Sequence, residues 1–397
     1  MRKLANRFSR LGTETAFMVG ADAAAWAAEG HKVYPFHLGD INISTPQHIV
    51  DAAMAGIKAG KTGYAPGPGI DPLRQALAED ISADRGIQLG PENISVQPGG
   101  KPTIGKFLNM VLEPGKGALY PNPGYPIYES QIDYLGGKAL PYGYTPTTDG
   151  FAINRDEIEA QIDGDTAALI YNNYQNPIGA ESGEEEMQWL ADLAIEHDLW
   201  VLSDEAYFDI RYGGKSKSIA SLPGMAERTV ILYTFSKKFA MTGWRLGCAA
   251  GPAEIIDGIS KHNANIESCS NHFVQMAGIA ALRGPDEPQQ GIVAELRRRR
   301  DTLVDRLLEI DGVKVTRPET TFYLFPDITE VYQRKGYQNS TEIRREALEK
   351  TGVSFCSREH FGRPLPGEDK VFVRFAYSGI PVDQIEEGLE RLAAFWE

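Results

Sequence analysis

From about residue 72 to about residue 285, short apolar segments alternate with segments of helical periodicity, and this alternation limits the possible folds more than any other feature of the sequence. The segments typical of strands cover residues 93–97, 117–120, 167–171, 199–202 and 229–233. Helical segments include 72–83, 102–112 and the stretch that runs to His197 from a predicted capping box, Ser182-x-x-Glu185. Because strands and helices that alternate in this way form parallel sheets covered on both faces, we predict an α/β fold with a mostly parallel sheet sandwiched by helices.

The two ends of the chain follow a different pattern. Residues 21–28 predict a short helix closed by Gly30, and residues 47–59 predict a helix between stretches rich in Gly and Pro. After about residue 285 the sequence predicts a long charged helix at 290–308, strands at 313–316, 321–325 and 371–375, and a last helix at 382–396. We therefore expect a smaller α+β domain built from both chain termini. The expected division is an N-terminal arm and part of the small domain at 1–48, a large cofactor-binding domain at 49–288 and the small C-terminal domain at 289–397.

Four consecutive arginines, Arg297–Arg300, lie within the predicted long helix. Leu296, Leu303 and Leu307 would form one buried stripe of that helix. We therefore expect the arginines to coat its solvated face rather than to form an anion site.

The charge and composition exclude several classes of function. The 40 Lys and Arg residues are outnumbered by 54 Asp and Glu residues, which gives a net charge of −14 and argues against a nucleic-acid or anionic-membrane partner. The chain has three scattered cysteines and no stretch approaching about 18 consecutive apolar residues, the length of a membrane-spanning helix. No apolar run follows the basic N-terminus, so no signal peptide is predicted and we expect a cytoplasmic location.

Familiar catalytic motifs are incomplete or missing. Residues 100–107 resemble a phosphate-binding P-loop, but Phe107 stands where the Ser or Thr is needed and Pro102 removes a backbone donor. Residues 67–69 lack the third glycine of a dinucleotide fingerprint, and the sequence contains neither an HExxH pair nor a GxSxG turn. We therefore expect no metal.

Polar residues follow the predicted strands, at the edge where open parallel sheets bind ligands. They comprise an anion site, an aromatic face, a carboxylate and a lysine: Gly100, Lys101, Tyr125, Asn176, Asp204, Tyr207, Thr234, Ser236 and Lys237. A charged aromatic heterocycle that bears a phosphate and an aldehyde would use all of these groups.

These residues also carry a family resemblance. The segment TFSKKFAMTGWRLG at 234–247 resembles the lysine segment of the class I and II pyridoxal-phosphate aminotransferases, of the aspartate-aminotransferase fold (fold type I). Further segments match the family in its order along the chain: 63–77, 98–101, 122–128, 172–179, 203–208 and 373–378. The resemblance implies pyridoxal 5'-phosphate as the cofactor.

The resemblance assigns roles on the cofactor ring residue by residue. Lys237 would form the Schiff base and shuttle the proton during transfer. Asp204 would pair with the ring nitrogen and favour its protonated form. Asn176 and Tyr207 would hydrogen-bond the phenolic oxygen of the ring, and Tyr125 would stack on the ring.

The resemblance also assigns the phosphate and substrate contacts. Arg245, Ser236, Thr234 and the backbone amides of Gly100 and Lys101 would hold the phosphate. Tyr64 would reach the phosphate from the neighbouring subunit, which implies a homodimer with shared active sites. Arg374 would clamp the α-carboxylate of the substrate, with the backbone of Gly39 and with Asn176 beside it.

Some positions depart from the family pattern. The usual GEPDFDTP is GDINISTP at 39–46, and the loop at 355–358 lacks the frequent Pro-Gly. A second cation that would select dicarboxylic substrates does not identify itself, and Lys101, Arg358 and Arg363 are the candidates.

Together these features predict a transaminase that moves an amino group between an L-α-amino acid and a 2-oxo acid by a ping-pong mechanism. A pyridoxal-phosphate-dependent C–S lyase that performs β-elimination on the same fold remains open, because it would use the same cofactor residues. A non-catalytic, ligand-responsive regulator is less consistent with an intact Lys237 and with the absence of a helix-turn-helix segment.

Overall fold

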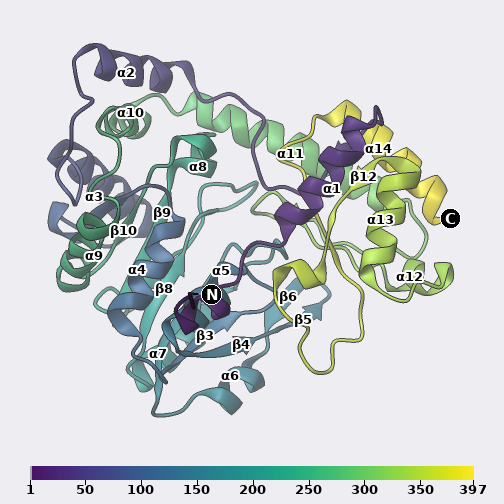
Figure 1. The fold of residues 1–397 in the computed structure, drawn as a ribbon, viewed down its shortest axis with the longest axis horizontal. Helices are drawn as coiled ribbons and strands as arrows, with labels where there is room; N and C mark the ends of the chain where they lie inside the picture. The colour runs from purple at the N-terminus through teal and green to yellow at the C-terminus, as the bar shows by residue number, and fades with distance from the viewer. Residues whose placement is uncertain (1) are drawn as a thin grey trace.

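The computed structural model describes residues 2–397, which contain a seven-stranded sheet in the order β2-β10-β9-β8-β7-β3-β4 (Figure 1). Neighbouring strands are parallel except at β10, which runs antiparallel to both β2 and β9. The strands are β2 (Ile94–Gln97), β3 (Gly117–Pro121), β4 (Lys138–Tyr142), β7 (Thr166–Tyr171), β8 (Trp200–Asp204), β9 (Thr229–Thr234) and β10 (Gly247–Ala250). A separate hairpin joins β5 (Tyr144–Thr147) to β6 (Gly150–Ile153).

Helices cover both faces of this sheet, because its central strands are apolar on both sides. In β7, Ile170 packs in a core with residues of α4, α5 and α9, whereas Leu169 packs in a different core with residues of α6 and α7. A third core joins α3 and α10 to the β2 end of the sheet, and α2 packs on α10. These helices are α2 (Gln47–Lys58), α3 (Asp71–Arg85), α4 (Lys101–Val111), α5 (Ile127–Leu135), α6 (Arg155–Gln161), α7 (Glu184–Glu196), α8 (Phe235–Lys238), α9 (Ala253–Ile266) and α10 (His272–Arg283). The predicted α/β class is confirmed.

Residues 16–35 and the C-terminal part of the chain form a smaller α+β unit (Figure 1). Its strand β1 (Tyr34–Pro35) pairs in parallel with β12 (Val353–Ser354), and β14 (Val373–Ala376) lies between β11 (Tyr323–Leu324) and β13 (Cys356–Ser357) in an antiparallel sheet. The helices of this unit are α1 (Ala16–Ala28), α11 (Glu287–Leu308), α12 (Thr329–Lys335), α13 (Ser340–Thr351) and α14 (Val382–Trp396). Chain divisions at residues 48 and 288 stay a prediction.

Short 3-10 helices link these elements: η1 (Asn6–Arg10), η2 (Pro91–Asn93), η3 (Ile219–Ser221), η4 (Thr242–Trp244) and η5 (Arg358–Phe361). Within residues 2–397, the structure has no helix with the length and apolar character needed to cross a membrane.

Three local predictions were wrong. Helix α7 has Gly183 as its N-cap and lacks a side-chain cap, because the loop holds Ser182 elsewhere, with its backbone N–H donating to Asn173 Oδ1 at 2.8 Å. Residues 313–316 form only an isolated bridge, from Lys314 to Asp327, since no extended partner strand lies beside them. The first helix begins at Ala16 rather than at residue 21.

The expectation for Arg297–Arg300 was also wrong for half of the run. Arg299 and Arg300 are buried, because this part of α11 packs against loops of the smaller unit. Arg299 Nη1 donates to the carbonyl of Ser378 at 2.6 Å, and Arg300 Nη1 donates to the carbonyl of Pro318 at 2.8 Å. These arginines therefore link loops to the helix, whereas Arg298 is exposed as predicted.

Candidate active site

A cavity of about 690 Å³ opens at the carboxyl ends of β7, β8 and β9. Its wall contains the residues expected to hold the cofactor: Gly100, Lys101, Tyr125, Thr234, Ser236 and Arg245. It also contains those expected to take part in catalysis or substrate binding: Gly39, Asn176, Asp204, Tyr207, Lys237 and Arg374. Tyr64 lies outside this cavity and is 90% exposed.

Asp204 is a buried carboxylate at the end of β8. Its Oδ2 accepts a hydrogen bond from Tyr128 Oη at 2.6 Å, and its Oδ1 accepts one from the backbone N–H of Ala206 at 3.2 Å. No Lys or Arg among residues 2–397 forms an ion pair with it. Burial raises the pKa of Asp204 to about 6, against the two hydrogen bonds that lower it. The site therefore lacks the cation that a buried carboxylate normally requires.

Lys237 is a partly buried lysine directly after β9, in the short helix α8. Its Nζ donates to the carbonyl of Gly39 at 2.8 Å, and no Asp or Glu within the described part of the chain pairs with it. Burial, together with the nearby Arg245 and Arg374, lowers the pKa of Lys237 to about 8, against the opposing effect of Asp40. A larger fraction of this amine is therefore neutral and nucleophilic near physiological pH than for an ordinary lysine.

One end of the cavity is rich in anion donors. Thr234 Oγ1 lies 2.9 Å from Ser236 Oγ, and the guanidinium of Arg245 lies over the start of α4, where the first backbone N–H groups have no partner within the helix. A Cβ at Gly99, whose φ is +101°, would lie 2.1 Å from Arg245 Nη2. A side chain at Gly99 would therefore displace this arginine from the helix N-terminus.

Arg374 lies at the other end of the cavity, on β14. Its Nη1 donates to Asn176 Oδ1 at 3.0 Å and its Nη2 donates to the carbonyl of His37, but its buried Nε has no partner within residues 2–397. The rings of Tyr323 and Phe361 lie 4.6 and 4.5 Å from the guanidinium carbon. This planar cation is held in place in the cavity wall, and a planar guanidinium suits a bidentate carboxylate.

The sequence profile of the class I and II aminotransferases matches residues 33–392. The chain belongs to this family. The aspartate aminotransferase of Bacillus subtilis strain 168 is 34% identical over 100% of this chain and 99% of its own length. The arginine–pyruvate transaminase of Pseudomonas aeruginosa is 32% identical over 88% of this chain and 90% of its own length. A solved structure of Thermus thermophilus aspartate aminotransferase with maleate superposes with a TM-score of 0.90 at 29% identity, over 99% of this chain and 100% of that one.

The protein is accordingly a pyridoxal-phosphate-dependent aminotransferase that moves an amino group between an amino acid and a 2-oxo acid. The cavity fits this cofactor. The unpaired carboxylate of Asp204 suits a protonated ring nitrogen, the amine of Lys237 suits an aldehyde, and the donors around Arg245 suit a phosphate. The relatives named above are aminotransferases, and nothing in them supports the C–S lyase considered as the alternative.

Sequence reasoning missed three side chains in the wall of this aminotransferase cavity. Tyr128 holds Asp204, and its spacing of three residues from Tyr125 is the signal that could have revealed it. Tyr323 Oη lies 2.7 Å from Tyr207 Oη and also lies against the backbone of Gly39. Glu14 Oε1 accepts a hydrogen bond from Tyr125 Oη at 2.6 Å, and no local sequence signal marks it.

Proposed function

We propose that Lys237, Asp204 and Tyr207 are the catalytic residues of this aminotransferase and that Arg374 binds the α-carboxylate of both substrates. The observation that carries this proposal is the presence, in one cavity, of a partly buried lysine and a buried carboxylate that each lack an ion-pair partner within residues 2–397. Burying such charges is unfavourable, and it is typical of a site that awaits a partner of complementary chemistry.

The cofactor supplies, when bound, a protonated ring that withdraws electrons from the amino-bearing carbon of the substrate. Lys237 would anchor the cofactor and would then act as the base that takes the proton from the substrate Cα, a role favoured by its lowered pKa of about 8. Asp204 would keep the ring nitrogen protonated, and Tyr128 fixes the orientation of this carboxylate. Tyr207 would donate a hydrogen bond to the ring oxygen, and Tyr323 holds its hydroxyl.

The remaining cavity residues position the two ends of the reactants. Arg245, Thr234, Ser236, Gly100 and the backbone of Lys101 hold the phosphate, and Tyr125 stacks on the ring. Arg374 would orient the substrate through its carboxylate, with Asn176 and Gly39 beside it, because the guanidinium lines the cavity and its Nη1 is fixed by the amide of Asn176. The order of events is ping-pong, with the amino acid leaving as a 2-oxo acid before the second 2-oxo acid binds.

The decisive experiment is borohydride reduction of the loaded protein followed by peptide mass spectrometry. We expect a pyridoxyl group on the peptide that contains Lys237. An adduct on another lysine, or an unmodified Lys237 in fully loaded protein, would overturn the assignment. A half-reaction with single amino acids then separates transamination, which yields the 2-oxo acid and an aminated cofactor, from elimination, which yields pyruvate and ammonia.

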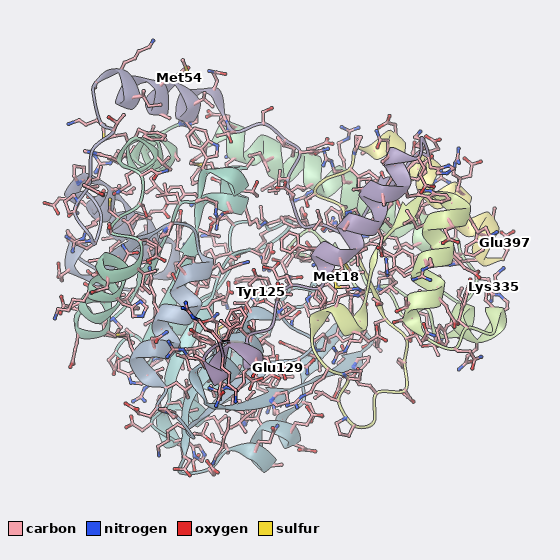
Figure 2. The ribbon with its side chains drawn as sticks, in the orientation of Figure 1. Met18, Met54, Tyr125, Glu129, Lys335 and Glu397 are labelled. Carbon is pink, nitrogen blue, oxygen red and sulfur yellow. The ribbon has the colours of Figure 1, made fainter. Side chains whose placement is uncertain are left out.

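A homodimer with shared active sites is the second part of the proposal. Tyr64 is 90% exposed in the loop after α2. Exposed apolar side chains lie on α2, at Met54 and Ile57, and at the end of α9, at Ile266. Figure 2 shows Met54 at the outer edge of α2. The Tyr64 loop is anchored to the end of α9, because Asn263 Nδ2 donates to the carbonyl of Gly67 at 2.9 Å. Such an exposed apolar face favours contact with a second copy.

Hybrid dimers test the sharing directly. A Lys237→Ala chain and a Tyr64→Ala chain are each impaired alone, but a mixed dimer contains one intact site if Tyr64 serves the other subunit. Co-expression should restore about a quarter of the wild-type activity, since half of the random dimers are mixed and each has one working site. No restoration would place Tyr64 in its own subunit's site or outside the site. A cytoplasmic location stays a prediction, which cell fractionation checks.

A further inference from the structure

Glu14 is a carboxylate in the wall of the active-site cavity. Its Oε1 forms an ion pair with Lys101 Nζ and accepts a hydrogen bond from Tyr125 Oη at 2.6 Å. Only 17% of its side chain is accessible. Its other oxygen, Oε2, accepts no hydrogen bond from residues 2–397, so it is available to a ligand.

The segment that carries Glu14 is fixed on both sides of it. Arg10 Nε donates to the carbonyl of Asp133 at 2.7 Å, and the backbone N–H of Gly12 donates to Ser130 Oγ at 2.9 Å, so that this segment lies along α5. Helix α1 starts at Ala16, directly after Glu14, and packs in the smaller unit. Glu14 is therefore a built part of the wall rather than the end of a loose arm.

The cavity has four cations besides histidine: Lys101, Lys237, Arg245 and Arg374. In the proposed function, on which this inference rests, three of them are occupied by the cofactor, its phosphate and the substrate α-carboxylate. Lys101 is paired with Glu14. Within residues 2–397, the cavity wall thus offers no unpaired cation for a second carboxylate on the substrate, and it offers carboxylate oxygens instead, those of Glu14 and of Asp40.

We infer that Glu14 determines the side-chain specificity of this aminotransferase. It neutralises Lys101, disfavours dicarboxylic amino acids, and selects amino donors whose side chain ends in a cationic group that Oε2 can accept. A dicarboxylic substrate would have to displace Glu14 from Lys101 and would still face its negative charge.

The test measures half-reactions of the loaded enzyme with L-arginine, L-alanine and L-aspartate. We expect the wild type to rank arginine above alanine and alanine above aspartate in kcat/KM. Glu14→Gln keeps an acceptor for Tyr125 but removes the charge. It should change the ratio of kcat/KM for aspartate to kcat/KM for arginine by about 10- to 100-fold in favour of aspartate. The kcat/KM for alanine should change little. The double variant Glu14→Gln with Lys101→Gln should lose the increase in kcat/KM for aspartate.

Glu129→Gln is the matched control. Glu129, labelled in Figure 2, lies on α5 and pairs with Arg363 at 3.4 Å, but it does not line the cavity. Its substitution should leave the ratio unchanged. A wild type that prefers aspartate to arginine, or a ratio that Glu14→Gln leaves unchanged, would overturn the inference.

Inhibitor binding gives a readout that is independent of catalysis. Maleate carries two carboxylates and propionate carries one, and their dissociation constants can be measured on the loaded wild type by the cofactor's absorption. We expect maleate to bind no more tightly than propionate in the wild type and more tightly in Glu14→Gln. Tighter binding of maleate to the wild type overturns the inference even if a variant does not fold. Failure of every half-reaction, in contrast, would reject the proposed function and leave the binding comparison to decide on Glu14.

Discussion

At two places in the chain a charged residue that lines the cavity is followed directly by a charged residue buried outside it. Asp204 and Lys237 face the cavity without ion-pair partners within residues 2–397, whereas Glu205 and Lys238 belong to a buried ion-pair cluster. This Arg85 cluster consists of Arg85, Lys238, Asp80, Asp84, Glu205 and Asp209. Adjacent residues of the same charge thus have opposite environments.

The pKa values of the two lysines express this difference. Burial lowers the pKa of Lys237 to about 8, whereas Asp209 and Asp80 raise the pKa of Lys238 above its ordinary value despite its burial. Glu205 Oε2 likewise accepts from Arg85 Nε at 2.9 Å, and the neighbouring Asp204 has only neutral donors. Reactivity here comes from a missing ion-pair partner, and stability comes from the presence of one.

The largest expected effect is a difference in kcat/KM between variants of Lys237 and Lys238. Lys237→Ala should lower kcat/KM by at least about 10⁴-fold, because the anchoring amine and the base are lost together. Lys238→Arg keeps a cation in the Arg85 cluster and should retain most of the activity. Steady-state kinetics of the two purified variants measure the difference. Similar losses in both would show that the cavity boundary does not divide reactive from structural lysines.

The second effect is a difference in the free energy of unfolding between variants of Glu205 and Asp204. Glu205→Gln leaves Arg85 buried without its closest carboxylate and should lower the free energy of unfolding by about 3–5 kcal/mol. Urea denaturation of cofactor-free protein measures it. Asp204→Asn is the matched comparison and should not destabilise that form. If Glu205→Gln leaves the free energy of unfolding unchanged, the ion pair of Glu205 with Arg85 does not stabilise the fold.

The third effect is a pH dependence at Asp204 in the cofactor-free protein. The pKa of this carboxyl is raised from 3.8 to about 6 on folding, so the folded state loses stability as pH rises between these values. Asp204→Asn should therefore stabilise the cofactor-free protein by about 3 kcal/mol above pH 7, and by little at pH 4. Thermal unfolding at both pH values measures it. With cofactor bound, the gain should vanish, because the ring nitrogen then supplies the missing cation.

The smallest effect concerns the hydroxyl that holds Asp204. Tyr128 lowers the pKa of Asp204 by its hydrogen bond, so Tyr128→Phe should raise that pKa further. The acidic limb of the kcat/KM profile should move to higher pH, with a loss of about 1 kcal/mol in transition-state stabilisation at neutral pH. Tyr171→Phe removes a buried hydroxyl outside the cavity wall and serves as the control. A shift in the control profile would assign the change to general packing.

Much of the fold followed from the sequence because it depends on local patterns. Strands β7, β8 and β9 are short apolar runs between helices, and the structure differs from their predicted bounds by one or two residues. The expectations that failed depended on contacts outside the local helix pattern. Ser182 is held by Asn173 instead of capping α7, and Arg299 is buried by the loop at Ser378.

The sequence by itself determined which groups gather at one edge of the sheet, because parallel strands bring their carboxyl ends together and the polar residues that follow them must meet there. Asp204 and Lys237 could be identified in this way. Only the tertiary structure decided which charges are paired. Glu14 and Lys101 are 87 residues apart, and Arg85 and Glu205 are 120 residues apart. Whether a charged side chain is reactive depends on burial and on partners from distant segments, and no local pattern encodes these.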